Sequence, residues 1–167
     1  MFLTFSYSPF SEGIFQMATS LIDKKTILLV EDNIADIRLI QNLLKDVNVQ
    51  ATLQVVTDGV MALSYLHRQG NYADAEMPDL ILLDWNLPKK NGCEVLVEVK
   101  SDPLLKHIPV IVLTTSDAES DVLTAYNNYA SSYLIKPVDL DNFIRVIKFI
   151  ESFWLQLVRL PAKKTHE

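Results

Sequence analysis

The sequence predicts an α/β fold, a doubly wound and mainly parallel sheet of five strands with helices on both faces. The first observation is that short aliphatic runs recur, at 27–30, 80–83 and 110–113. Runs of this kind, bounded by polar residues, are typical of strands that are buried on both faces. The second observation is that segments with helical spacing of apolar residues follow the runs. Strands that alternate with helices in this way favour a parallel sheet.

Two weaker strands complete the predicted sheet. Residues 51–56 alternate loosely between apolar and polar side chains, and residues 132–135 form a short run before Lys136-Pro137. The first helix has Asp32 or Asn33 as its expected N-cap. The predicted helices span residues 33–46, 60–67, 92–100 and 117–127, and a last long helix begins at Asp139.

One domain is expected, because 167 residues suffice for a single packed core. We place this domain at residues 24–160, between an N-terminal extension at 1–23 and a C-terminal tail at 161–167. Within it, the polar stretch from Gln69 to Pro78 is expected to be a loop insertion.

Composition and charge exclude several classes of function. The net charge of −6 argues against non-specific nucleic-acid binding, which needs a basic face. No stretch approaches the apolar length of a membrane span. Cys93 is the single cysteine, so no disulfide can form within the chain, and the scattered histidines give no zinc-type cluster. We therefore expect a cytoplasmic protein without nucleic-acid or membrane partners.

The first twenty residues differ from the rest, because they are rich in Phe and Ser and lack Lys and Arg. A secretory signal would begin with a basic region, which this segment lacks. Two interpretations stay open, a loosely attached tail or a start codon placed upstream of the true one at Met17. The aromatic residues of the segment could also dock on a neighbouring surface.

Polar residues follow four of the five predicted strands. They are Glu31 and Asp32 after the first strand, Asp84 after the third, Thr114 after the fourth and Lys136 after the fifth. Taken singly, each has an ordinary structural interpretation: a helix N-cap for an aspartate, a strand former for Thr114, a solvated side chain for Lys136. Because the carboxyl ends of parallel strands meet at one edge of the sheet, their joint position favours a shared site.

The residue types at this edge point to phosphoryl chemistry. Three close carboxylates repel one another unless a cation compensates, and Mg²⁺ is the expected cation because it prefers oxygen ligands. Lys136 supplies a positive charge and Thr114 a hydroxyl, which are the groups that an anionic phosphoryl group requires. Together these groups describe phosphoryl transfer to an aspartate.

Five separated motifs in this order make the chain similar to a known family. They are Ile27-Leu28-Leu29-Val30-Glu31-Asp32-Asn33, Leu83-Asp84-Trp85-Asn86-Leu87-Pro88, Gly92, Val112-Leu113-Thr114-Thr115 and Tyr133-Leu134-Ile135-Lys136-Pro137. With them the chain resembles the receiver domains of two-component response regulators, the CheY-like family, from about Lys24 to Trp154. The resemblance implies the strand order 2-1-3-4-5.

The same resemblance implies a role for each residue of the site. Asp84 would accept a phosphoryl group from the phosphohistidine of a histidine kinase and form an acyl phosphate. Thr114 would turn toward the phosphoryl oxygens, Lys136 would pair with them, and Tyr133 would swing inward as Thr114 moves. The implied Mg²⁺ ligands are Asp32, Asp84, the backbone carbonyl of Asn86 and, through a metal-bound water, Glu31. The Lys136–Pro137 bond is typically cis in this family.

Further features resemble the small regulators that partner cyanobacterial phytochromes. They are the Val30–Asn33 signature with Asp36, the block from Leu83 to Gly92, and the Phe153-Trp154 pair near the end. This resemblance would make the donor a light-sensing kinase of the phytochrome type.

The last predicted helix carries more apolar surface than one packed face requires. The stripe expected to face the sheet is Leu140, Phe143, Ile144, Ile147, Ile150, Trp154 and Val158, and an adjacent arc holds Val146, Phe149, Phe153 and Leu160, with Leu157 between the two. Together they exceed the roughly 100° of an ordinary one-sided helix. We expect a homodimer through this helix and the preceding strand, with Val146, Phe149, Phe153 and Leu157 at the interface. The N-terminal tail or the neighbouring helix could cover the surplus instead.

The leading prediction is a single-domain response regulator, rather than an enzyme, whose output runs through protein–protein contacts. Two alternatives stay open. A Mg²⁺-dependent phosphatase with an aspartyl intermediate would usually carry a general acid where this chain has Asn86, which cannot do acid–base work. A receiver that acts purely as an adaptor, without phosphorylation, would not need the complete set of acids, hydroxyl and lysine.

Overall fold

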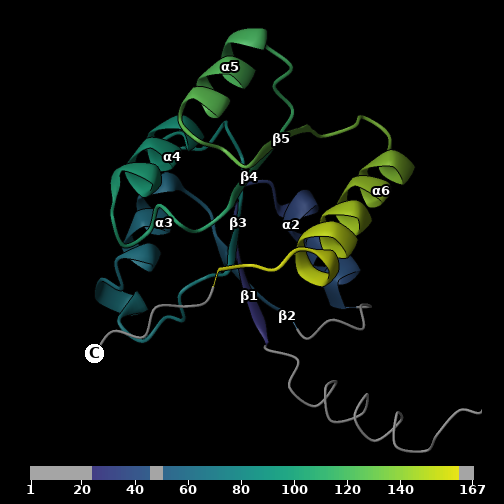
Figure 1. The fold of residues 1–167 in the computed structure, drawn as a ribbon. Coiled ribbons are helices and arrows are strands. Elements are labelled where there is room, and N and C mark those ends of the chain that lie inside the picture. The colour runs from purple at the N-terminus through teal and green to yellow at the C-terminus, as the bar shows by residue number, and fades with distance from the viewer. Residues whose placement is uncertain (1–23, 46–50, 162–167) are drawn as a thin grey trace, which may run out of the picture.

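A five-stranded parallel sheet forms the centre of the molecule and confirms the predicted fold class (Figure 1). The computed structural model describes residues 24–45 and 51–161. The strands run in the order β2-β1-β3-β4-β5, and every neighbouring pair is parallel. The strands are β1 (Lys25–Val30), β2 (Ala51–Val56), β3 (Leu80–Leu83), β4 (Val110–Thr114) and β5 (Ser132–Ile135).

Helices cover both faces of the sheet, which gives three layers (Figure 1). On one face lie α3 (Gly59–Leu66), α4 (Gly92–Ser101) and α5 (Glu119–Asn127); on the other lie α2 (Ile34–Lys45) and α6 (Leu140–Ile150). The predicted bounds differ from these by one or two residues at most ends. The predicted end of the first helix, Asp46, and the N-terminal extension lie outside the described residues.

The central strands are buried on both faces, as their aliphatic runs predict. Along β1, Leu28 and Val30 point into the core beneath α3, α4 and α5, whereas Ile27 and Leu29 point into the core beneath α2 and α6. Strands β3 and β4 alternate in the same way, and all of their residues are buried. This alternation fixes the register, because a shift by one residue would exchange the two faces.

The polar stretch between α3 and β3 is an ordered connection rather than a bare loop. It contains a short 3₁₀ helix, Gly70–Tyr72. The hydroxyl of Tyr65 donates a hydrogen bond of 2.8 Å to the carbonyl of Glu76, and Tyr72 and Met77 pack against the core on the α3 side. These contacts tie the insertion to the start of β3.

The last helix departs from its prediction, because its regular α part ends at Ile150. A π-helical segment, η2 (Glu151–Leu157), continues it. A π-helix bonds residues five apart, and the next buried side chain after Ile150 is Leu155, five positions later, while Trp154 packs half-buried against the same core. Two residues were misplaced: Leu140, the first residue of α6, is exposed although it was assigned to the sheet-facing stripe, and Leu160, which lies beyond the end of η2, is buried although it was assigned to the outer arc of the helix.

The outer arc of this helix is only partly free. Val146 packs against the core beneath α2 and α6, so its side chain is half-buried rather than fully on the predicted interface. Phe149, Phe153 and Leu157 are exposed, and the rings of Phe149 and Phe153 stack with their centroids 5.7 Å apart. Separately, none of the described helices is long and apolar enough to cross a lipid bilayer.

Two glycines let the β3–α4 loop lie directly against its surroundings. A methyl group at Gly92 would lie 2.7 Å from the Cα of Trp85 and closer still to the carbonyl oxygen of Asp84. A methyl group at Gly59 would overlap the carbonyl of Lys90 in the same loop. Both obstacles are backbone atoms, which cannot rotate out of the way as a side chain can.

Gly92→Ala is therefore expected to lower the free energy of unfolding by about 1–2 kcal/mol. Alanine is the better helix former by about 1 kcal/mol, but overpacking against fixed atoms costs about 1–3 kcal/mol. Urea unfolding measures the loss, and Ser120→Ala, at an exposed position of α5, is the control, because it introduces alanine into a helix without adding an atom against a neighbour. The Gly92 change should also shift Trp85 fluorescence in the folded state; wild-type stability and fluorescence would contradict the close approach.

Candidate functional site

The predicted polar residues meet at the carboxyl edge of the sheet, where backbone hydrogen bonds extend the ladder one residue past β1, β3 and β5. The amide of Glu31 donates to the carbonyl of Val56 at 3.0 Å, and the amide of Asp84 donates to the carbonyl of Val30 at 3.0 Å. On the other side, the amide of Lys136 donates to the carbonyl of Thr114 at 2.7 Å. The residues at the strand ends are thus held by main-chain contacts.

Three carboxylates form one acidic cluster at this edge. Glu31, Asp32 and Asp84 each offer an oxygen, and these oxygens lie within 4.8 Å of one another. Glu31 and Asp84 are buried, whereas Asp32 is exposed to solvent. Hard divalent cations prefer oxygen ligands and keep several waters, so a cluster with one open side fits Mg²⁺ or Mn²⁺.

Lys136 is the cation of the site. Its Nζ lies 2.5 Å from Oε2 of Glu31 and 3.5 Å from Oδ2 of Asp84. A third carboxylate, Asp36 on the first turn of α2, lies 2.9 Å from the same Nζ. The lysine side chain is only 5% exposed, so it is a buried ion-pair centre and not the solvated surface residue that it would be by itself.

Burial and ion pairing act in opposite directions on the two most buried charges. Burial by itself would lower the pKa of Lys136, but the hydrogen bonds to Glu31 and Asp36 outweigh it and raise that pKa, so the ammonium stays charged at neutral pH. Burial raises the pKa of Glu31 against the opposing hydrogen bond from Lys136. The lysine is therefore what makes a buried Glu31 carboxylate tolerable.

Thr114 and Tyr133 are linked through the segment that follows β4. Thr114 is fully buried, and its hydroxyl accepts a hydrogen bond of 3.3 Å from the amide of Ser116. The hydroxyl of Tyr133 donates to the carbonyl of Ser116 at 3.0 Å. The ring of Tyr133 also packs edge-on against Trp85, next to Asp84, with centroids 6.1 Å apart. One chain of contacts thus joins β3, β4 and β5 at this edge.

The loop after β3 is held in place by a contact of Asn86 and by an ion pair between Lys89 and Asp58, two residues that the sequence did not indicate as part of the site. The backbone amide of Asn86 donates a hydrogen bond of 3.3 Å to Oδ1 of Asp84. Farther along, Lys89 forms a 2.6 Å ion pair with the buried carboxylate of Asp58, whose other oxygen caps α3 through the amide of Met61. Burial of Asp58 would raise its pKa, but the hydrogen bond from Lys89 outweighs this and lowers it.

Two details correct or extend the predictions. The peptide bond between Lys136 and Pro137 is trans, and the described residues contain no cis peptide bond. Asp36 belongs to the pocket, although the sequence indicated it only as part of a signature. The sequence feature that could have indicated Asp36 is its position four residues after Asp32, in the first turn of the predicted helix. An acid is favoured there because the N-terminal end of a helix carries partial positive charge.

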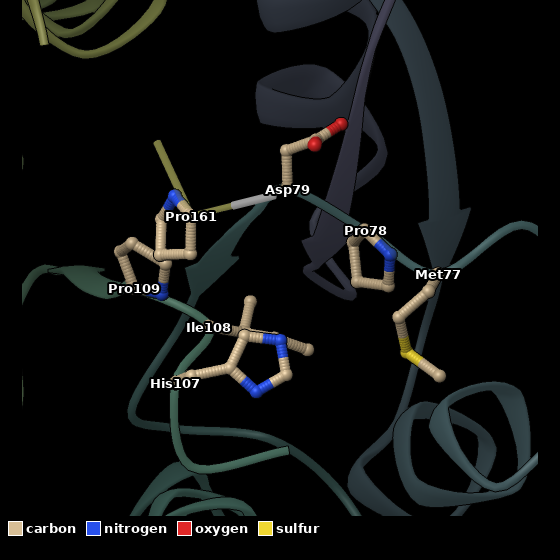
Figure 2. A pocket seen from close by; sticks show the side chains of 7 residues that line it. All are labelled: Met77, Pro78, Asp79, His107, Ile108, Pro109 and Pro161. Atoms are coloured by element: carbon tan, nitrogen blue, oxygen red, sulfur yellow. The ribbon is translucent and has the colours of Figure 1, made fainter. Parts of the chain in front are cut away.

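Apart from the acidic cluster, a small cavity lies at the opposite, amino-terminal end of the strands (Figure 2). Its volume is about 10 Å³, which is close to the minimum for one water molecule. Figure 2 shows Asp79, His107 and Pro161 around this space, with Pro78 and Pro109 beside them. The cavity is too small for an organic substrate and lies before β3 and β4, whereas the acidic cluster lies beyond their other ends.

Comparison with known proteins identifies the family. The family of the response regulator receiver domain matches residues 27–148. The chain belongs to this family. Response regulator Rcp1 from Synechocystis sp. is 49% identical over 138 residues, which cover 83% of this chain and 94% of that protein. The predicted resemblance to the receiver domains of two-component systems is thereby confirmed.

Solved structures of receivers confirm the CheY-like fold. A crystal structure of Rcp1 in its Mn²⁺-bound form superposes with a TM-score of 0.81 at 49% identity, covering 83% of this chain and 99% of that one. The phosphorylated cyanobacterial phytochrome response regulator RcpA gives the same TM-score at 51% identity and the same coverage. This receiver is thus close to regulators of phytochrome signalling, as its sequence features indicate.

Removing the lysine should expose the cost of burying Glu31. We expect Lys136→Met to lower the free energy of unfolding in EDTA by about 3 kcal/mol at pH 8, because it leaves a buried carboxylate unpaired. Burial then holds the folded-state pKa of Glu31 above its unfolded value, so the folded state binds more protons. The deficit relative to wild type should shrink as the pH falls toward 5.

The double variant Glu31→Gln/Lys136→Met is the matched control, because it removes the titrating carboxyl. Its deficit should be smaller at pH 8 and should change less between pH 8 and pH 5 than that of the single variant. Denaturant unfolding at both pH values measures all three chains. A single-variant deficit of equal size at both pH values would contradict the assignment of Glu31 as the buried partner.

Proposed function

We propose that this receiver is a phosphorylation-controlled signalling protein that accepts a phosphoryl group on Asp84 from a histidine kinase. The observation that supports this proposal is the joint placement of the acidic cluster and Lys136, whose Nζ lies 3.5 Å from Oδ2 of Asp84. A buried carboxylate can act as a nucleophile toward phosphorus. The buried ammonium beside it would then pair with the phosphoryl group that the carboxylate has accepted.

The proposed step is a direct transfer between two protein side chains. A carboxylate oxygen of Asp84 forms a bond to phosphorus, the bond between phosphorus and the kinase histidine nitrogen breaks, and the histidine keeps that electron pair. Lys136 then pairs with a phosphoryl oxygen, and the hydroxyl of Thr114 donates to another. Tyr133 follows the movement of Thr114 through the segment at Ser116, which both residues contact.

The acidic cluster is the proposed Mg²⁺ site. Asp32, Asp84 and the backbone carbonyl of Asn86 would hold the ion, with Glu31 acting through a metal-bound water. A divalent ion there would offset the repulsion between carboxylates and an incoming phosphoryl group. The existence of a Mn²⁺-bound form of Rcp1, which is 49% identical to this chain, supports the proposal of a divalent ion.

The donor that we propose is a phytochrome-type histidine kinase, and the site of action is the cytoplasm. The support is similarity: RcpA, a phosphorylated cyanobacterial phytochrome response regulator, is 51% identical to this chain. The proposed receiver spans residues 24–160, and its output would run through contacts with other proteins.

Asp84→Asn should abolish phosphorylation. We expect the wild-type chain, incubated with Mg²⁺ and phosphoramidate, to gain the mass of one phosphoryl group, and the variant to gain none, because an amide oxygen is a far weaker nucleophile. Intact-mass spectrometry measures the adduct. Asp141→Asn, an exposed acid on α6, is the matched control and should be phosphorylated as wild type is. Chelation of the metal with EDTA should slow adduct formation in the wild-type chain and in Asp141→Asn.

The same experiment separates the three functions considered. An adduct that outlasts many cycles of donor turnover supports a switch. Rapid turnover of many phosphomonoesters would instead indicate a phosphatase, and the absence of any adduct would indicate an adaptor. An adduct that persists in Asp84→Asn would show that the acceptor is another residue.

We also propose a homodimer through the last helix. The supporting observation is the exposed set of Phe149, Phe153 and Leu157 on α6 and η2, which borders an open groove of about 480 Å³ with Ser152 and Gln156. Apolar side chains gathered on one face favour a protein contact. Val146, which is half-buried against the core, would contribute only its outer edge.

Phe153→Ser should weaken this dimer by about tenfold or more, the scale of a central aromatic contact. Sedimentation at micromolar concentration, with and without phosphorylation, measures the association. Leu123→Ser on α5, an exposed leucine away from the last helix, is the control. A wild-type chain that is monomeric under both conditions would rule out the dimer.

A further inference from the structure

The ammonium of Lys136 has no hydrogen-bonding capacity left for a further acceptor. An ammonium carries three N–H donors, and three carboxylates lie around this one. The distances from Nζ are 2.5 Å to Glu31, 2.9 Å to Asp36 and 3.5 Å to Asp84. The contact with the proposed phosphoryl acceptor is the longest of the three. The lysine is thus drawn toward β1 and α2 and away from Asp84.

Asp36 is firmly placed for this contact. It is the third residue of α2, and the side chain of Asn33 caps that helix by accepting from the amides of Ala35 at 2.9 Å and Asp36 at 3.2 Å. The amide of Asn33 in turn donates to Glu31 at 3.0 Å. One capped turn therefore presents both Glu31 and Asp36 to the lysine from the same side.

A helix-capping role would not account for the position of the Asp36 carboxylate. An acid in the first turn stabilises a helix from any orientation near its N-terminus. The Asp36 carboxylate instead accepts a hydrogen bond from the buried ammonium of Lys136, which lies one hundred residues later in the chain. Its side chain is 23% exposed, so the ion pair is partly shielded from water.

We propose that Asp36 is a positioning residue that holds Lys136 back from Asp84 and so restrains phosphorylation of the receiver. The inference rests on the proposed function of Asp84. To pair with a phosphoryl oxygen, Lys136 must give up one of its present partners. Glu31 is the more buried and the closer of the two neighbours on that side, so the contact with Asp36 is the one more readily exchanged.

The charge of Asp36 acts in the same direction. Three carboxylates contact the single lysine of this pocket, Asp32 lies beside them in the acidic cluster, and a phosphoryl group adds further negative charge. A carboxylate within contact of the lysine opposes the arrival of that group, because like charges at short range disfavour each other. Competition for the lysine and repulsion of the phosphoryl group thus both slow transfer.

Asp36→Asn is expected to speed adduct formation with phosphoramidate about fivefold at saturating Mg²⁺, the factor that corresponds to about 1 kcal/mol for a partly exposed ion pair. Beryllofluoride, a stable phosphoryl mimic, should bind about fivefold more tightly to the variant. Intact mass follows the first, and Trp85 fluorescence in a Trp154→Phe background follows the second, because the chain has two tryptophans.

Two matched variants separate positioning from other effects. Asp36→Glu keeps the charge and the reach to Lys136 and should restore the slow wild-type rate. Asp117→Asn removes an exposed acid from the segment between β4 and α5 without touching Lys136, and it should leave the rate near wild type. Equal acceleration in Asp117→Asn would mean that net charge alone matters, and it would overturn the inference.

The outcomes also distinguish this inference from the proposed function. A wild-type chain that forms no adduct overturns the proposed function and this inference together. A wild-type chain that forms an adduct, with Asp36→Asn equally fast or slower, overturns the inference alone. An Asp36→Glu chain as fast as Asp36→Asn overturns it too, because restored charge and reach would then not restrain the lysine.

Discussion

Lys136 supplies the positive charge that allows carboxylates to stand buried at neighbouring strand ends. Without that ammonium, Glu31 would be an unpaired charge with 1% of its surface exposed, and taking such a charge out of water costs several kcal/mol. The position of the lysine depends in turn on the sheet, because its amide is tied to Thr114 on the adjacent strand. The ion pair between Glu31 and Lys136 therefore depends on a correctly folded fifth strand.

The parallel sheet turns distant sequence positions into neighbours. The ion pair between Glu31 and Lys136 joins residues 105 positions apart, and it forms because every strand ends at the same edge of the sheet. Main-chain hydrogen bonds carry the ladder one residue beyond the strands, so the polar residues are held as rigidly as the sheet itself. Rigid placement suits the metal ion and the phosphoryl group that we propose for this site, because both need ligands in fixed geometry.

The surroundings of Asp84 connect that rigid edge to the surface. Gly92 lets the loop after β3 lie against the backbone of Asp84, and the ion pair of Lys89 with Asp58 fastens the same loop to α3. Tyr133 contacts both Trp85 and the segment after β4. A change at the proposed acceptor can therefore reach β5, whose last residue, Ile135, is exposed, as is Val138 beyond the strand. A signalling protein needs such a route from its chemistry to its surface.

Much of this arrangement was present in the sequence. The aliphatic runs determined which strands are central, since only a strand covered on both faces has no polar position, and the acids, hydroxyl and lysine at their ends indicated the site. The sequence could not give the pairing of Lys136 with Asp36, because the two residues are 100 positions apart and come into contact only when the sheet is assembled. Nor could the sequence give the end of the last helix. The change to π-helical spacing buries Leu155 and leaves Leu157 exposed, and a pattern with a period of 3.6 residues does not predict this change. Local pattern decided the elements and the chemistry of the site, and tertiary contact decided which charges meet.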